Sequence, residues 1–122
     1  MPNYWRCGLS AIVLACTVMS LSALAGVEGS YACRGTNPDG SPYSGTVEIT
    51  QHGEGYLVAW SIGGSGYSGT GIFSENQLSA SWGVKGSEYG IVVYKLENDG
   101  RLVGKWLNPS SVKYGTETLT PR

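Results

Sequence analysis

Hydrophobic and polar residues alternate in short runs over most of the chain, and turn-forming residues separate the runs. One run alternates Val47 and Ile49 with Glu48 and Thr50, as expected of a strand with one buried face. The same pattern predicts strands at 31–34, 43–51, 56–62, 67–73, 77–82, 89–96, 101–107 and 114–120. Because no run shows the 3.6-residue period of a helix, the pattern predicts an all-β fold.

The predicted strands are joined by short turns, such as Asn37-Pro38-Asp39-Gly40 and Asn98-Asp99-Gly100. Short connections require neighbouring strands to pair antiparallel, as a meander. A segment at 40–46 is echoed at 64–70, which indicates repeated hairpins. Rolling the sheet into a closed barrel covers its apolar face and removes both of its edges. We therefore expect a small eight-stranded antiparallel up-and-down β-barrel rather than a sandwich.

The first 25 residues have the features of a signal peptide. Arg6 precedes an apolar run at 8–24, and Ala23-Leu24-Ala25 has the small-x-small form of a cleavage site. We expect cleavage before Gly26, a single mature domain at 26–122, and export to the periplasm or the extracellular surface. A retained anchor and a lipoprotein attached through Cys16 are the alternatives.

Composition narrows the function classes. The 122 residues fit one domain, and 19 Gly, 8 Tyr and 4 Trp accompany a charged fraction of only 14%. The formal net charge of −1 predicts neither a nucleic-acid partner nor attraction to an anionic membrane. After cleavage only Cys33 remains, so it is either a buried apolar residue or a thiol for an intermolecular bond.

The search for catalytic chemistry is mostly negative. His52, the one histidine, lies in a Gly-rich turn without a Ser or Cys partner. Gly64-x-Gly66-x-x-Gly69 matches a dinucleotide fingerprint, but a strand follows it rather than the required helix. Acidic residues fall singly, mostly in turns or on outward faces such as that of Glu48, and no metal cluster is evident. We therefore expect a non-enzymatic protein without a metal or cofactor.

Aromatic residues are concentrated on the faces predicted to point inward. The candidate interior residues are Tyr43, Tyr56, Trp60, Tyr67, Trp82, Tyr94 and Trp106. An eight-stranded barrel is either filled by side chains or holds one small ligand. The aromatic set therefore forms either a packed core, with Trp60, Trp82 and Trp106 as its anchors, or the lining of a ligand site.

Two of the longer connections are candidate partner-binding loops. They are the segments around 83–89 and 108–114, and their candidate contact residues are Lys85, Glu88, Tyr89, Lys113 and Tyr114.

Four segments of the chain resemble a known group of proteins. They are 35–47, 56–64, the Asp99-Gly100-x-Leu102-x-Gly104-x-Trp106 segment and the closing Gly115-Thr116-Glu117. This group comprises small exported proteins of Gram-negative bacteria that are commonly labelled fibronectin-binding protein. The resemblance covers nearly all of the mature chain. It implies an adhesin-like binding protein whose partner is an extracellular-matrix or other protein, engaged through loops or the outer barrel face.

The Leu102-x-Gly104-x-Trp106 pattern also looks like avidin-type and lipocalin-type barrels and like small barrel inhibitors of bacterial metalloproteases. These likenesses imply two alternative functions: binding of a small molecule at the barrel mouth, or inhibition of a hydrolase. An open pocket above roughly 300 Å³ lined by Trp and Tyr would favour the small-molecule binder, whereas a dry, filled interior would favour the macromolecule-binding protein.

Overall fold

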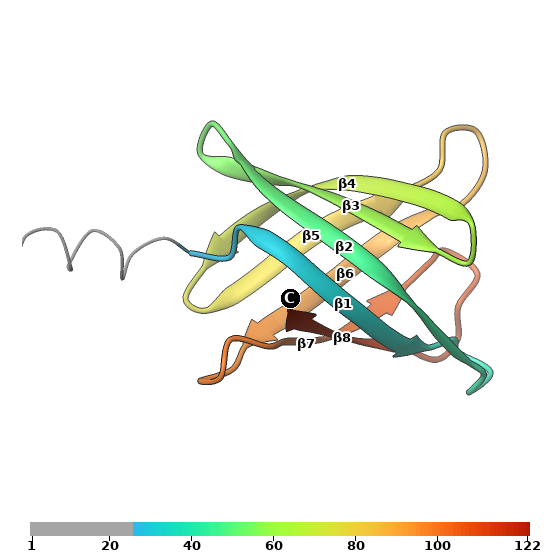
Figure 1. Ribbon diagram of the computed structural model, residues 1–122. Coiled ribbons are helices and arrows are strands. Elements are labelled where there is room, and N and C mark those ends of the chain that lie inside the picture. Colours follow the sequence, from blue (N-terminus) through green and yellow to red (C-terminus); the bar gives the residue numbers. More distant parts are fainter. Residues whose placement is uncertain (1–25) are drawn as a thin grey trace, which may run out of the picture.

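The chain folds into eight β-strands in sequence order, shown in Figure 1 for a computed structural model that describes residues 26–122. The strands are β1 (Gly29–Thr36), β2 (Pro42–His52), β3 (Gly55–Ile62), β4 (Ser65–Ser74), β5 (Gln77–Gly83), β6 (Tyr89–Leu96), β7 (Leu102–Leu107) and β8 (Gly115–Pro121). The described residues contain no helix, so the predicted all-β fold class is confirmed.

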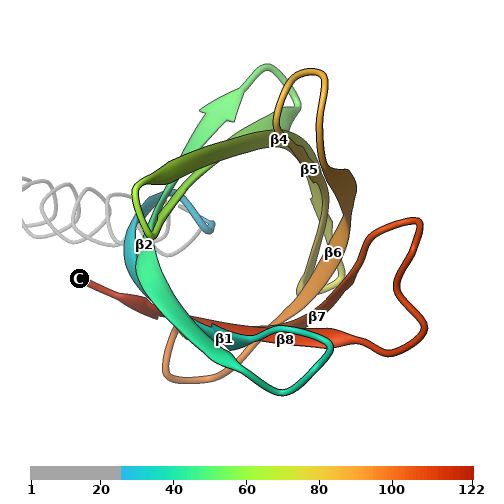
Figure 2. The same cartoon turned by 90° about the vertical axis from the view of Figure 1, so that its right-hand side faces the viewer.

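The sheet closes on itself as an up-and-down barrel, as predicted. Each strand pairs antiparallel with the next, and β1 pairs with β8 from Tyr31 opposite Pro121 to Thr36 opposite Thr116. Figure 2 looks along the barrel from the end that carries the β1–β2 turn. Closure leaves neither edge strand free to pair with another chain.

Strand positions follow the alternation in the sequence. In β3, Tyr56, Val58 and Trp60 are buried, whereas the intervening Leu57 is exposed. The strand limits lie within about two residues of those expected from the pattern. The largest difference is the first strand, which was predicted at 31–34 and spans Gly29–Thr36.

The two ends of the barrel differ. One end is closed by large buried side chains, among them Leu78, Leu102 and Leu119. Val27 precedes β1 and is also buried there, where its carbonyl accepts a 2.7 Å hydrogen bond from the Tyr31 hydroxyl. The connections that follow β1, β3, β5 and β7 lie at the opposite end, which we call the mouth (Figure 1).

The predicted signal peptide and its cysteines lie at 1–25, outside the described residues. Within 26–122, no helix is long and apolar enough to cross a membrane. Cys33 is buried in the barrel interior, which agrees with the first of its two predicted roles.

Candidate functional site

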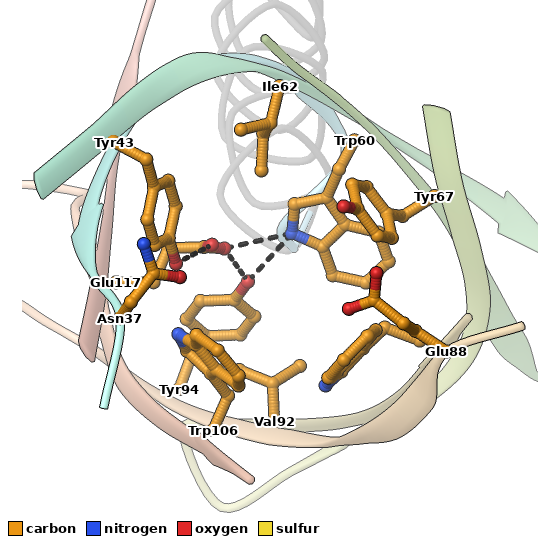
Figure 3. A pocket seen from close by; sticks show the side chains of 11 residues that line it. Asn37, Tyr43, Trp60, Ile62, Tyr67, Glu88, Val92, Tyr94, Trp106 and Glu117 are labelled. Carbon is orange, nitrogen blue, oxygen red and sulfur yellow. Dashed lines mark hydrogen bonds between the residues drawn. The ribbon is translucent and has the colours of Figure 1, made fainter. Parts of the chain in front are cut away.

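The mouth of the barrel contains a pocket of about 260 Å³ (Figure 3). Its lining residues are Asn37, Tyr43, Trp60, Ile62, Tyr67, Trp82, Glu88, Val92, Tyr94, Trp106 and Glu117. The volume is slightly below the roughly 300–1,000 Å³ typical of drug-sized ligands. The pocket is therefore sized for one small molecule or one inserted side chain.

Glycines on neighbouring strands keep the centre of the pocket open. Trp82 lies directly opposite Gly90, and Trp106 lies opposite Gly115. A Cβ atom added to Gly90 would lie only 2.6 Å from Cζ2 of Trp82, and one added to Gly115 would also collide with the Trp106 indole. The rings therefore lie against the barrel wall over the glycines instead of filling the interior.

Four of the lining rings form a continuous series of tilted or edge-to-face contacts around the pocket. The ring centroids of Tyr67 and Trp82 are 5.9 Å apart with an interplanar angle of 76°. Trp82 and Trp106 are 5.5 Å apart at 89°, and Trp106 and Tyr43 are 6.5 Å apart at 60°. Edge-to-face contacts are favourable aromatic geometry. They hold the four rings as a curved wall with faces in several directions.

Glu117 lies at the base of the pocket and is 5% exposed. Its Oε1 accepts a 2.7 Å hydrogen bond from the Tyr43 hydroxyl. Its Oε2 accepts a 2.8 Å bond from Trp60 Nε1 and a short bond from the Tyr94 hydroxyl. All three donors are neutral, so they stabilise a carboxylate without cancelling its charge.

The groups around Glu117 are held in their protonated forms. Burial, reinforced by the negative charge of Glu117, raises the pKa of the Tyr43 and Tyr94 hydroxyls. The same two causes raise the pKa of the Cys33 thiol. Both phenols therefore remain hydrogen-bond donors at neutral pH, and Cys33 is a poor nucleophile because it lacks thiolate character.

Two indole N–H groups at the mouth differ in their partners. Trp82 Nε1 donates a 3.3 Å hydrogen bond to the Ile91 carbonyl. Trp106 Nε1 is buried and has no hydrogen-bond partner among the described residues. A buried unpaired donor is costly, so this N–H is available to an acceptor that enters with a ligand or water.

The structure divides the predicted interior aromatics into two groups. Tyr56 packs in the closed end, whereas Tyr43, Trp60, Tyr67, Trp82, Tyr94 and Trp106 line the pocket. Of the three predicted core anchors, only Trp60 is fully in the core. Trp82 and Trp106 are half-buried because one side of each ring faces the open mouth. The two readings of the aromatic set thus apply to different ends of one barrel.

Both candidate loops lie at the mouth. Glu88 points into the pocket (Figure 3), whereas Lys85 and Lys113 are exposed on the rim. Tyr89 and Tyr114 are exposed on the outside of the barrel. The Lys105 ammonium lies 5.1 Å from the centroid of the Tyr114 ring. The loops therefore frame the pocket, and only Glu88 among these five residues lines it.

Glu117 is an exception to the expectation that acidic residues lie mostly in turns or on outward faces. This residue alternates in β8 with Thr118, in register with inward-facing Gly115 and Leu119. Its place in this two-residue alternation was the sequence signal that could have predicted an inward-facing side chain. With Glu88 at the rim, the pocket brings together two carboxylates that are distant in sequence, although no carboxylate pair was predicted.

The other candidates for chemistry have structural roles. His52 is exposed at the end of β2. Asp39 and Asp99 accept hydrogen bonds from the backbone N–H two residues later, as turn residues do. Within 26–122, no group of three or more His, Cys, Asp or Glu side chains is placed to hold a metal ion.

The resemblance to exported proteins labelled fibronectin-binding remains a prediction. No model of a known protein family matches the chain, and no curated protein matches it.

Proposed function

We propose that this protein binds a small organic molecule in the pocket at the mouth of the barrel. The observation that carries the proposal is the contrast between the two ends of one interior. The closed end is packed with apolar side chains, whereas the mouth keeps about 260 Å³ open. Concave sites with aromatic walls and a few fixed polar groups are typical of ligand pockets.

We propose that the protein binds its ligand without transforming it. Tyr43 and Tyr94 have raised pKa values and serve as donors to Glu117, so neither is suited to act as a base at neutral pH. The Cys33 thiol is buried and has a raised pKa as well. Glu117 has both carboxylate oxygens engaged by fixed donors. These features favour a rigid, preorganised binding site.

Trp82→Ala should weaken binding of any pocket ligand by about ten-fold or more, because central aromatic anchors dominate binding energy. The measurement is an NMR titration of the indole N–H signals with four classes of probe: organic ammonium ions, organic carboxylates, neutral aromatics and sugars. Ile72→Ala is the matched control, since Ile72 is 69% exposed on the outside of β4. Equal effects of the two variants, or no saturable shift with any class, would contradict the proposal.

The rim supports a second candidate function, binding of a macromolecule such as an extracellular-matrix protein. The loop between β7 and β8 carries Val112, which is 95% exposed, and Tyr89 is 64% exposed beside the other loop. Apolar side chains this exposed are typical of contact surfaces when they cluster. If the protein is instead a hydrolase inhibitor, the hydrolase would contact the same rim.

Replacing both rim loops with Asn-Gly turns separates the two candidates. If a macromolecule binds through the loops, this variant should lose nearly all binding to immobilised fibronectin or another partner while the barrel remains folded. Circular dichroism provides the folding control. Undiminished partner binding by the folded variant would exclude the loops as the contact.

We also propose that the protein acts after export, in the periplasm or at the extracellular surface. The support is the charged, apolar and small-residue order of 1–25, which has the form of a signal peptide.

A further inference from the structure

The pocket has an uncompensated negative charge. Glu117 lies at its base and Glu88 at its rim, and none of the lining residues is Lys, Arg or His. The donors to Glu117 are two phenols and an indole, all of them neutral. One salt bridge is found within 26–122, between Arg101 and Asp99. It lies in the β6–β7 turn at the opposite end of the barrel, away from the pocket. A carboxylate in a half-enclosed site attracts a cation more strongly than one in water does.

The aromatic wall suits a cation rather than a flat ring. Tyr67, Trp82 and Trp106 meet at 76° and 89°, so their faces do not form a flat platform on which a sugar ring could stack. Faces that turn toward a common space can surround a rounded group. Tryptophan provides the strongest cation–π contacts of the aromatic residues.

We propose that the ligand of this pocket is an organic cation, with an ammonium group that carries small alkyl substituents. The ammonium would lie among the rings of Trp82, Trp106 and Tyr67, and Glu88 and Glu117 would supply the balancing charge. The inference rests on the proposed binding function and specifies its ligand class. The volume of about 260 Å³ is suited to such a compact group.

The two positive side chains on the rim loops do not oppose this assignment. Lys85 and Lys113 are exposed on the rim loops and do not line the pocket. Salt at physiological strength screens exposed charges over roughly 8 Å, whereas partly buried charges are screened much less. The field inside the pocket is therefore set mainly by the buried Glu117, and Glu88 is the one charged rim residue that lines the pocket.

Choline and its uncharged isostere 3,3-dimethyl-1-butanol test the proposal directly, because they differ in charge but hardly in shape. We expect choline to shift the indole N–H signals of Trp82 and Trp106 saturably, and to bind about ten-fold or more tightly than the alcohol. Equal affinities for the two probes would overturn the cation assignment.

Variants of the carboxylates provide the second test. Glu88→Gln should weaken choline binding several-fold without affecting folding, because Glu88 is an exposed residue at the rim. Glu54→Gln is the matched control, since Glu54 is exposed in the β2–β3 turn at the closed end. Equal effects of these two substitutions would count against a role for the pocket charge.

Failure of this inference can be told apart from failure of the proposed function. A neutral or anionic probe that binds in a Trp82-dependent manner, while choline does not bind, would refute the cation and leave the small-molecule function standing. No saturable shift of the pocket indoles with any probe class would refute both.

Discussion

Replacing Trp60 with alanine should lower the free energy of unfolding by about 3–5 kcal/mol, the usual cost of deleting a large buried ring. Trp60 is 5% exposed, and its neighbours are fixed on a closed barrel that cannot collapse to fill the space. The substitution also removes one of the three hydrogen-bond donors to Glu117, which is itself buried. Urea denaturation followed by circular dichroism measures the loss.

Trp82→Ala and Trp106→Ala should cost clearly less than Trp60→Ala, because both rings are half-buried and already face open space. In the packed-core reading of the sequence, all three residues are core anchors. If all three variants unfold at similar urea concentrations, the pocket does not stay open in solution. If Trp60→Ala unfolds near the wild-type midpoint, Trp60 is not the anchor of the core.

Most of the fold could be predicted because it depends on local patterns. Alternation located the strands, and the short connections left only antiparallel neighbours, from which barrel closure followed. The buried face of β3, with Tyr56, Val58 and Trp60, could be read directly from the sequence. Strand ends were harder to locate, because residues expected in a turn can also pair between strands. Thr36 and Pro42, for example, pair at the ends of β1 and β2.

The site was harder to predict because it depends on pairing between strands. Glycine at position 90 or 115 indicates only a flexible backbone until the register places it opposite Trp82 or Trp106. Whether inward aromatics fill a barrel or line a pocket depends on such pairings, so both outcomes remained open. Glu117 was missed because a charged residue is rarely buried, and its three donors come from β2, β3 and β6.

Alkaline pH should destabilise this barrel strongly, by about 4 kcal/mol between pH 8 and 11 from Cys33 and Tyr94 alone. The ordinary pKa values of these groups are 9.0 and 10.0, and burial is the main cause that raises both in the folded barrel. Below about pH 8 the folded and unfolded states both retain the two protons, so stability is unaffected. Above it the unfolded chain releases them and the folded barrel does not, so stability falls as pH rises.

Urea denaturation at a series of pH values measures this loss, and Cys33→Ala isolates one contributor. The variant starts from a lower stability because alanine leaves a small cavity. Its decline between pH 8 and 11 should nevertheless be shallower than that of the wild type by about 3 kcal/mol, the share of the one missing thiol. Parallel declines of variant and wild type would show that Cys33 ionises in the folded barrel. A thiol that ionises there would be reachable by water, which contradicts the buried position of Cys33.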